Sequence, residues 1–281
     1  MKILVTGAAG QLGYDVCVEL AKRGIEYKGI DRAELDICDK ATVREYLIEY
    51  APDAVIHCAA YTAVDKAEDE PEVCFAVNAD GTQNLAEVCK QLGAKLLYIS
   101  TDYVFPGQGK MFYEVTDNFN PLGVYGASKL AGELAVKSIL AKYFIVRISW
   151  AFGKNGANFV KTMLRLAETH NEIGVVCDQI GSPTYTKDLA ILLCDMIQTE
   201  KYGTYHVTNE GICSWAEFAE EIFCLSGKDV QVKHLASAEY PARAARPFNS
   251  RLSKNCLTRA GFNRLPKWQD ALQRYLIEIE N

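Results

Sequence analysis

Short apolar runs alternate with amphipathic stretches through the first half of the chain. The apolar runs are rich in β-branched and aromatic residues and are too short for helices, so they predict strands. The predicted strands are residues 2–7, 26–31, 53–60, 95–100 and 143–149. The stretches between them predict helices at residues 11–24, 40–50, 73–93 and 120–140. Nearly continuous apolar strands separated by helices are typical of a parallel sheet covered on both faces, so we predict an α/β, Rossmann-like, doubly wound fold.

The pattern becomes less regular after about residue 150. Helices are predicted at 158–170 and 214–227, the second with Ser214 as N-cap and Glu217 at the capping-box position. The predicted strands of this part are residues 204–208 and 230–235. We expect residues 1–150 to form a nucleotide-binding domain and residues 151–281 to form mainly a smaller C-terminal substrate-binding lobe. Residues 178–200 are expected to pack back on the first domain.

The composition of the chain argues against several classes of protein. With 281 residues, 49% of them hydrophobic and 23% charged, the chain has ordinary globular usage and can bury a full core. The net charge of −6 disfavours a nucleic-acid partner. The sequence has no apolar run of about 18 residues and begins directly with a strand pattern, so we expect a cytoplasmic protein without a membrane anchor. Ten scattered cysteines without a CxxC pair predict reduced thiols and no zinc site.

A glycine-rich loop follows the first predicted strand and opens the first predicted helix. In TGAAGQLG (6–13) the spacing is G-x-x-G-x-x-G, with Gly7, Gly10 and Gly13. Glycines at these points allow a tight turn, close approach of backbone N–H groups to a pyrophosphate, and close packing of helix on strand. The motif alone is weak evidence, but its strand–loop–helix context favours a dinucleotide cofactor.

The acidic residue that ends the second predicted strand bears on whether the cofactor is NAD or NADP. Asp31 stands 18 residues after Gly13 and can accept both hydroxyls of an adenine ribose, which favours NAD. The adjacent Arg32 can pair with a 2′-phosphate, which favours NADP. The sequence leaves both open. Asp36 is placed to meet the adenine end, with a solvated loop acid as the alternative.

Tyr125 and Lys129 in VYGASKLAGE (124–133) are the candidate catalytic pair. Residues at i and i+4 lie on one helix face, so both side chains can point at the same ligand. We expect the Lys129 ammonium to stabilise the phenolate of Tyr125 and to lower its pKa toward the range of a working general acid. Carbonyl reduction needs such an acid, because hydride delivery leaves an alkoxide.

Two hydroxyl residues strengthen the interpretation of this pair. Ser100 and Thr101 end the fourth predicted strand, and open α/β sheets bind ligands at the carboxyl ends of their strands. We choose Thr101 to hold the substrate carbonyl oxygen. The alternative for Thr101 is the cap of a helix or turn.

Four segments together resemble the extended short-chain dehydrogenase/reductases that act on sugar nucleotides. They are TGAAGQLG (6–13), AAYTAVDKAE (59–68), STDYVF (100–105) and YGASK (125–129). Within this group the chain resembles the dTDP-4-dehydrorhamnose reductases more than the epimerases or dehydratases. The additional segments are RISWAFG (147–153), DQIGSPTYTKDLA (178–190) and RPFNSRL (246–252), so the resemblance covers nearly the whole chain.

The resemblance implies reduction of the 4-keto group of a nucleotide-linked deoxysugar by NADH or NADPH. The substrate it implies is dTDP-4-dehydrorhamnose, giving dTDP-rhamnose for cell-surface polysaccharide. Tyr125 is implied as the proton donor, Lys129 as its support and as a ligand of the nicotinamide ribose, and Thr101 as the carbonyl anchor. The other residues implied to contact the cofactor are Gly7, Gly10, Gln11, Leu12, Gly13, Asp31, Asp36, Ile37, Ala60, Tyr61, Thr62 and Ser100.

For the substrate, the resemblance implies contacts from Asp102 and Trp150. An ordinary core tryptophan is the alternative for Trp150. Arg246 and Arg251 can neutralise a nucleotide diphosphate, and solvated surface arginines are the alternative. Some proteins of the group bind Mg²⁺ at a dimer contact. Asp15 matches one ligand position, but the sequence supplies no other ligand, so we assign no metal, and a homodimer is compatible with the chain.

Two rival functions remain. A sugar-nucleotide epimerase or dehydratase shares the fold, but a dehydratase needs additional carboxylates beside the strand-four hydroxyl, where the chain has Asp102 and no glutamate after it. The regulatory subunit of methionine adenosyltransferase also resembles these reductases, and it binds a partner without catalysis. The intact Tyr125, Lys129 and Thr101 favour an enzyme.

Overall fold

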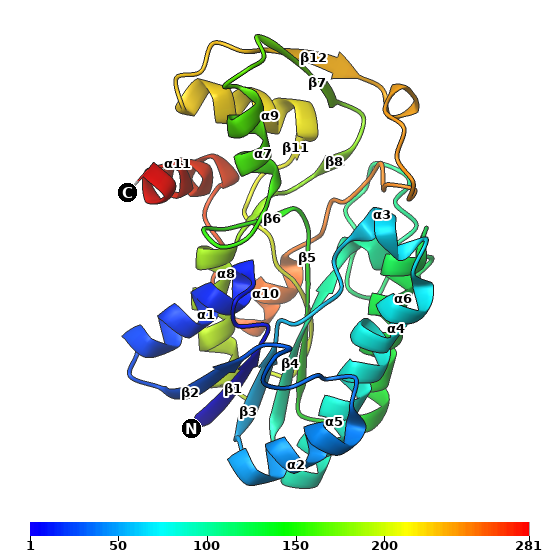
Figure 1. Ribbon diagram of the computed structural model, residues 1–281, viewed down its shortest axis with the longest axis vertical. Coiled ribbons are helices and arrows are strands. Elements are labelled where there is room, and N and C mark those ends of the chain that lie inside the picture. The colour runs from blue at the N-terminus through cyan, green and yellow to red at the C-terminus, as the bar shows by residue number, and fades with distance from the viewer. Residues whose placement is uncertain (281) are drawn as a thin grey trace.

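The computed structural model describes residues 1–280 and is built around one parallel sheet (Figure 1). The order of its strands is β10-β5-β4-β3-β1-β2, and every neighbouring pair is parallel. The strands are β1 (Lys2–Thr6), β2 (Glu26–Ile30), β3 (Ala54–His57), β4 (Lys95–Thr101), β5 (Tyr143–Ile148) and β10 (Gly203–His206). β3 is completely buried, as expected for a strand covered on both faces.

Helices cover both faces of this sheet, so the predicted doubly wound, Rossmann-like fold is confirmed. One face packs on α1 (Gln11–Lys22), α8 (Thr186–Ile197) and α10 (Asn255–Ala260) through residues such as Leu20, Leu193 and Leu257. The other face packs on α2 (Lys40–Tyr50), α5 (Gly81–Leu92) and α6 (Val124–Ile139). The two sets of apolar side chains form separate core clusters, one on each side of the strands.

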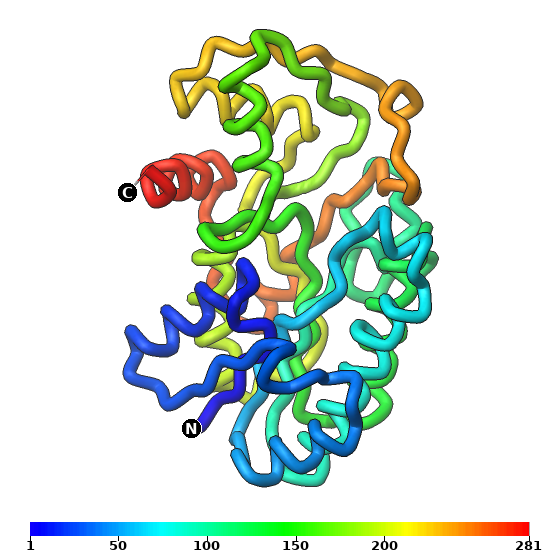
Figure 2. The backbone as a smooth tube through the Cα atoms, viewed as in Figure 1, coloured from blue at the N-terminus to red at the C-terminus, as the bar shows by residue number. Residues whose placement is uncertain are grey.

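A smaller lobe lies beyond the carboxyl ends of the parallel strands (Figure 1). Its helices are α7 (Phe159–Leu166), α9 (Trp215–Leu225) and α11 (Trp268–Glu280), which share a third apolar cluster. Its paired strands are β7 (Glu172–Val176) with β12 (Gln231–Leu235), β8 (Ile180–Gly181) with β11 (Cys213–Ser214), and β6 (Ala151–Phe152) with β9 (Thr184–Tyr185). Figure 2 shows that the chain crosses between sheet and lobe several times.

The start of α9 shows how local sequence fixes an element. Ser214 Oγ accepts a hydrogen bond from the backbone N–H of Glu217 at 3.1 Å, and Glu217 Oε2 accepts one from the backbone N–H of Ser214 at 2.6 Å. This reciprocal pair satisfies two donors that a helix start leaves unpaired. The capping box predicted from the sequence is confirmed.

One prediction about an element was wrong. The strand predicted at 204–208 was assigned to the lobe, but β10 pairs with β5 and forms an edge of the main sheet. The helix predicted over 73–93 is confirmed, and it contains a π-helical turn that the sequence did not predict: α4 (Pro71–Phe75) continues through the π-turn η1 (Ala76–Asp80) into α5. A short strand pattern does not specify its partner, and a π-turn leaves the apolar pattern almost unchanged.

The remaining short elements are α3 (Val64–Ala67), η2 (Asp102–Val104) and η3 (Ser237–Glu239).

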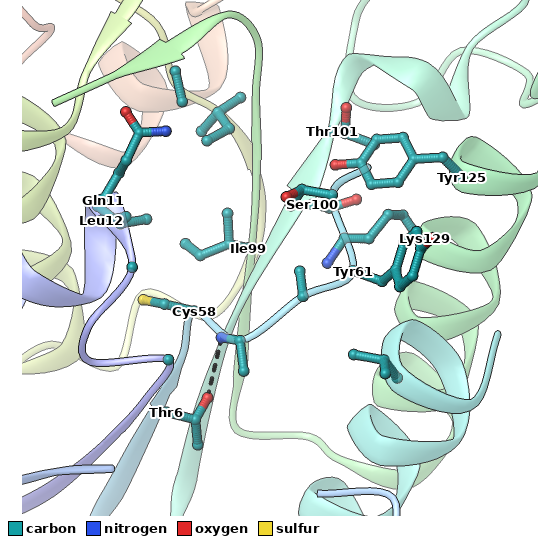
Figure 3. Close-up of a pocket in the computed structure, with 18 of the residues that line it drawn as sticks. Thr6, Gln11, Leu12, Cys58, Tyr61, Ile99, Ser100, Thr101, Tyr125 and Lys129 are labelled. Carbon is teal, nitrogen blue, oxygen red and sulfur yellow. Dashed lines mark hydrogen bonds between the residues drawn. The ribbon is translucent and has the colours of Figure 1, made fainter. Parts of the chain in front are cut away.

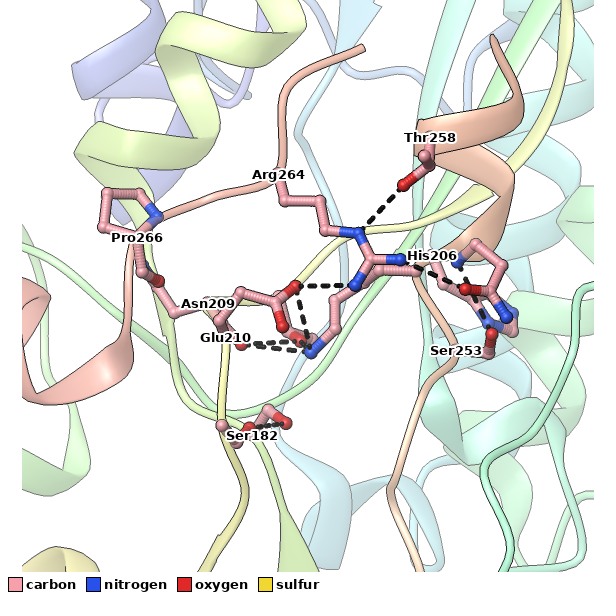
Figure 4. A network of polar contacts seen from close by, with 12 residues as sticks. Ser182, His206, Asn209, Glu210, Ser253, Thr258, Arg264 and Pro266 are labelled. Carbon is pink, nitrogen blue, oxygen red and sulfur yellow. Dashed lines mark hydrogen bonds and ion pairs between the residues drawn. The ribbon is translucent and has the colours of Figure 1, made fainter. Parts of the chain in front are cut away.

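A polar network joins the segment that follows β10 to the C-terminal part of the chain (Figure 4). The buried Lys254 ammonium donates to Thr208 Oγ1 at 3.2 Å and to the carbonyl of Asn209 at 3.3 Å. Glu210 lies 3.9 Å from Lys254 Nζ and 3.6 Å from Arg264 Nη1. These contacts hold residues 208–210 and 254–264 together beside the edge of the sheet.

Candidate active site

A cavity of 780 Å³ lies between the carboxyl ends of the parallel strands and the lobe (Figure 3). Its walls come from the loop after β1, the ends of β2, β3, β4 and β5, one face of α6, and the first residue of α9. This is the position at which open α/β sheets bind ligands, because loops leaving the strand ends diverge there.

The glycine loop forms the part of the wall nearest β1. Gly7 has φ +68°, and a Cβ at this position would stand 2.7 Å from the backbone nitrogen of Ala59. A Cβ on Gly13 would stand 2.0 Å from the carbonyl oxygen of Gly7. Glycine is therefore required at both positions. Gly7, Gly10, Gln11 and Leu12 line the cavity, whereas Gly13 lies behind the lining and allows α1 to approach the loop.

The end of the cavity at β2 carries the residues predicted for the adenosine. Asp31, Asp36 and Ile37 all line it. Asp31 Oδ2 accepts a hydrogen bond from the backbone of Ala9 at 2.9 Å, which fixes the carboxylate against the glycine loop. Arg32 also lines the cavity, pairs with Asp36 at 3.2 Å and has a side chain that is 82% exposed. A guanidinium so exposed is free to turn toward an anionic ligand.

Ala60, Tyr61 and Thr62 follow β3 and line the middle of the cavity. Asn78, in the π-turn η1, holds this segment: its Oδ1 accepts from the Tyr61 backbone N–H at 2.9 Å, and its Nδ2 donates to the Tyr61 carbonyl at 3.0 Å. Asn78 Nδ2 also donates to Ser128 Oγ at 3.0 Å on α6. Sequence analysis missed Asn78, for which the available signal was an asparagine within an apolar helix pattern.

The predicted catalytic residues share one wall of the cavity (Figure 3). Tyr125 and Lys129 come from adjacent turns of α6, and Thr101 and Ser100 come from the end of β4. The Lys129 ammonium lies 4.1 Å from the centre of the Tyr98 ring, and the Tyr125 ring meets Tyr103 edge-on at 5.5 Å. The structure thus places two hydroxyls, one phenol and one ammonium along the same side of the cavity.

The electrostatics of the pair differ from the sequence-based expectation. Burial, and then the charge of Asp102, raises the pKa of Tyr125, although the nearby Thr101 hydroxyl opposes this rise. Burial lowers the pKa of Lys129 to about 7, with the charge of Glu133 opposing the fall. The expectation that Lys129 lowers the pKa of the phenol was therefore wrong for the structure, because burial has the largest effect on both groups. Tyr125 is protonated at neutral pH, which is the form a proton donor needs.

Thr101 has a second task beside lining the cavity. Its Oγ1 accepts a hydrogen bond from the backbone of Tyr103 at 3.2 Å and so caps the 3-10 turn η2. The same hydroxyl donates to Asp102 Oδ1 at 3.0 Å. Asp102 lines the cavity, and its Oδ2 accepts a hydrogen bond from Ser250 Oγ. Both oxygens of this carboxylate are therefore engaged within the protein.

Sequence analysis also missed a buried ion pair behind the catalytic wall. Glu133 lies one turn beyond Lys129 on α6, and its carboxylate accepts from Arg147 Nε and Nη2, both at 2.7 Å. Both side chains are completely buried. Ser100 Oγ donates to Glu133 Oε1 at 2.6 Å, so the pair fixes the Ser100 hydroxyl. The i, i+4 spacing to Lys129 was visible in the sequence, but the burial of an acid was not.

Two stacked tryptophans separate this cavity from a second one of 540 Å³ in the lobe. Trp150 and Trp215 line both cavities, and their rings stack at 3.8 Å between centroids. Trp150 has a left-handed backbone with φ 51°. Its ring lies over Gly181, where a Cβ would approach it to 2.8 Å. The rings are thus walls of the cavities, and sequence analysis missed Trp215.

The two predicted arginines occupy different environments. Arg246 lines the second cavity, and its Nη2 donates to Asp65 Oδ2 at 2.6 Å. Within residues 1–280, its other terminal nitrogen, Nη1, is buried and has no hydrogen-bond partner. Arg251 lies outside the walls of both cavities, and its Nη1 donates to Asn249 Oδ1 at 2.9 Å. The structure therefore brings Arg246 to the second cavity but brings Arg251 to neither of these two cavities.

Asp15, the residue considered for Mg²⁺, is buried on α1 and accepts a hydrogen bond from Thr186 Oγ1. Burial raises the pKa of its carboxyl group. Among residues 1–280 no group of three or more His, Cys, Asp or Glu side chains is arranged to hold a metal ion.

No helix in the same residues is long and apolar enough to cross a membrane.

The parallel sheet, the glycine loop that tolerates no side chain, and the Tyr–Lys pair at the strand ends define a Rossmann-fold oxidoreductase of the NAD(P)-dependent class. The chain belongs to the family described as the RmlD substrate binding domain, whose model matches residues 1–281. This match confirms the family resemblance drawn from the sequence motifs.

Relatives cover the full length of the chain. The spore coat polysaccharide biosynthesis protein SpsK of Bacillus subtilis is 42% identical, over 99% of this chain and 97% of that protein. The crystal structure of a dTDP-4-dehydrorhamnose reductase from Clostridium acetobutylicum has a TM-score of 0.98 and 43% identity, with 100% of both chains covered. The dTDP-4-dehydrorhamnose reductase of Bacillus anthracis, solved in complex with NADP, has a TM-score of 0.96 and 46% identity over 99% of each chain.

Proposed function

We propose that the protein reduces the 4-keto group of a dTDP-linked deoxysugar, dTDP-4-dehydrorhamnose, with NADPH or NADH as the reductant. The product, dTDP-rhamnose, would supply cell-surface polysaccharide. The observation that carries the proposal is the common wall of Tyr125, Lys129 and Thr101, which faces the same cavity as the glycine loop. Full-length relatives named dTDP-4-dehydrorhamnose reductase, one of them in complex with NADP, support the substrate and the cofactor.

The cavity fits a dinucleotide. Gln11 and Leu12 line the cavity at the start of α1, and the first N–H groups of a helix have no partner within the helix, so they suit a pyrophosphate. Asp31 at the end of β2 suits a ribose, and the exposed Arg32 beside it suits a 2′-phosphate. This pairing supports use of both cofactors. When bound, the reduced cofactor supplies a hydride to the carbonyl carbon.

The residues of the wall then divide the work of carbonyl reduction. Tyr125, protonated at neutral pH, gives its proton to the oxygen that becomes the hydroxyl. Lys129, on the next turn of α6, binds the cofactor ribose. Thr101 holds the carbonyl oxygen. Lys129 and Thr101 are almost completely withdrawn from water and Tyr125 is partly buried, which strengthens each of these interactions.

The second cavity is proposed for the nucleotide. It adjoins the first at Trp150 and Trp215, so a sugar beside Tyr125 can remain attached to a nucleotide in the lobe. The buried, unpaired Nη1 of Arg246 suits a diphosphate oxygen, since a guanidinium donor left without a partner gains most from an anion. We withdraw the same role from Arg251, which lies outside both cavities.

The test is a reductase assay with purified protein, dTDP-4-dehydrorhamnose and either NADPH or NADH. We expect cofactor oxidation that depends on the keto-sugar, and a product with the sugar C4 hydroxyl. Tight cofactor binding without oxidation would instead support the non-catalytic regulatory role. Loss of water from the sugar without net oxidation of the cofactor would support a dehydratase. Inversion at a sugar carbon without net oxidation of the cofactor would support an epimerase.

We also infer that the protein works in the cytoplasm. All ten cysteines are free, and five of them are buried in the packed interior as thiols, which suits a reducing compartment.

A further inference from the structure

A buried chain of hydrogen bonds connects the two cavities through one carboxylate. Ser250 Oγ, on the wall of the second cavity, donates to Asp102 Oδ2. Thr101 Oγ1, on the wall of the first, donates to Asp102 Oδ1 at 3.0 Å. The three side chains have exposed fractions of 2% for Ser250, 3% for Asp102 and 5% for Thr101. Water is thus almost excluded from the chain, and its hydrogen bonds are made within the protein.

The donor count of Thr101 limits what it can do for a substrate. A threonine hydroxyl has a single proton, and here Asp102 accepts it. Thr101 Oγ1 also accepts from the backbone N–H of Tyr103, so it faces the cavity without a free donor. A ketone oxygen only accepts hydrogen bonds. Thr101 can donate to such an oxygen when its proton turns away from Asp102, and a protonated Asp102 makes this turn favourable, because it then donates to Thr101 itself.

We propose that Ser250 is a positioning residue for the substrate carbonyl, which acts by holding the Asp102 carboxylate that sets the direction of the Thr101 proton. The proposal rests on the proposed reductase function. In the state with Asp102 ionised, Ser250 and Thr101 both donate to the carboxylate. When Asp102 gains a proton, Thr101 is released to donate to the keto oxygen beside Tyr125.

The Ser250 hydroxyl is not needed to hold its own segment in place. The backbone N–H of Ser250 already donates to the carbonyl of Ile180 at 2.8 Å, and the neighbouring Asn249 N–H donates to the carbonyl of Gly107 at 2.9 Å. These bonds remain when the side chain of Ser250 is removed. The hydroxyl therefore has Asp102 as its specific partner, and its loss changes the carboxylate more than the fold.

The surroundings of Asp102 place its titration in an accessible range. Burial raises the pKa of Asp102 to about 6, and the hydrogen bonds from Ser250 and Thr101 oppose the rise. The titratable groups that face it are the phenols of Tyr103, on its own turn η2, and Tyr125, on α6. Burial raises the pKa of both phenols, so both stay neutral as Asp102 titrates. Arg246 lies beyond Tyr103, on the segment that carries Ser250.

The test compares the pH dependence of kcat/KM for dTDP-4-dehydrorhamnose in the wild type, Ser250→Ala and Ser250→Thr. We expect kcat/KM to fall as the pH rises through the titration of Asp102. Loss of the Ser250 donor destabilises the ionised carboxylate, so in Ser250→Ala the fall moves to higher pH by about one unit. Ser250→Thr keeps the hydroxyl and should restore the wild-type profile. Ser253→Ala is the matched control, since Ser253 is a buried serine of the same segment whose side chain does not contact Asp102.

A second measurement does not depend on turnover. Infrared difference spectra follow the Asp102 carboxyl band against pH, with Asp102→Asn to identify the band, and the titration should move upward in Ser250→Ala. The proposal is overturned if folded Ser250→Ala changes neither the titration of the Asp102 infrared band nor the pH profile of kcat/KM. It is also overturned if the titration of the band moves but the pH profile of kcat/KM does not. If Ser250→Ala does not fold, a folded Asp102→Asn that keeps the inflection of kcat/KM overturns it instead. A wild type without reductase activity refutes the proposed function, while the infrared shift still tests the link between Ser250 and Asp102.

Discussion

The two cavities meet at a pair of tryptophans but are built in opposite ways. The wall that holds Tyr125, Lys129 and Thr101 consists of strand ends and one helix, and the completely buried Glu133–Arg147 pair lies directly behind it. The second cavity is lined largely by the irregular segment 237–250, which includes side chains as exposed as Tyr240 at 57%. The proposed catalytic groups are thus held by regular, buried elements, whereas the proposed nucleotide site is held by loops. Changes in the first region should therefore alter kcat, and changes in the second should alter KM.

The largest expected effect is that of Tyr125→Phe. The substitution keeps the ring and its contact with Tyr103 but removes the phenolic proton. We expect kcat to fall by at least about 100-fold, the usual contribution of a positioned general acid, with cofactor affinity unchanged. Steady-state kinetics together with a cofactor titration measure both quantities. Unaltered kcat would remove Tyr125 from the mechanism.

Gly13→Ala tests the rigid region through packing alone. The new Cβ would lie 2.0 Å from the carbonyl oxygen of Gly7, so the loop or α1 must move. We expect a loss of about 1–3 kcal/mol in the free energy of unfolding and weaker cofactor binding. Gly24→Ala is the control: Gly24, unlike Gly13, has a left-handed backbone, but no atom lies within 4 Å of the added Cβ, so cofactor binding should be retained. Equal cofactor affinities in the two variants would contradict the account.

The arginines of the loop region provide a matched pair. Arg246→Gln removes a guanidinium from the second cavity, and Arg251→Gln removes one that lies outside both cavities. We expect KM for the nucleotide-sugar to rise about 10-fold in Arg246→Gln, the cost of one charged hydrogen bond, with kcat nearly unchanged. Arg251→Gln should leave both constants unchanged. A larger effect at Arg251 would reverse the assignment.

The smallest effect concerns stability and pH. Burial lowers the pKa of Lys129 from an ordinary value of 10.5 to about 7, so the charged form is the one that burial disfavours. Below pH 7 the residue is charged in both folded and unfolded states, and the full penalty is present. As the pH rises above 7 the folded protein loses this proton before the unfolded chain does, and the penalty is relieved. Lys129→Met should therefore raise Tm more in mildly acidic than in alkaline buffer, and thermal melts across this range measure the difference. A pH-independent gain would argue that Lys129 stays charged in the fold.

The difference between the two regions also decides what the sequence could predict. Apolar runs and the glycines that follow them are local signals, and they mark where the strands end. It was therefore predictable that Gly7, Asp31, Thr101 and Tyr125 line one cavity. The Ser214 capping box is equally local, and it was confirmed.

Long-range pairings were not predictable. The chain passes through the lobe before β10 joins the main sheet. Nothing in TYHVT (204–208) specifies β5 as the partner of this strand. The link from Ser250 to Asp102 spans 148 positions, and the burial of Glu133 depends on Arg147 from another element. The pKa of Tyr125 was predicted with the wrong sign for the same reason, because burial depends on how the whole molecule packs.

The central claim is that the protein moves a hydride to the sugar carbon beside Tyr125, and isotope tracing tests it most directly. Wild-type protein is supplied with dTDP-4-dehydrorhamnose and NADPH deuterated at the transferable position of the nicotinamide, and the sugar product is analysed by NMR. The account predicts one deuterium at sugar C4 for each NADPH oxidised. Cofactor oxidation without deuterium at C4, or deuterium at another carbon, would contradict it.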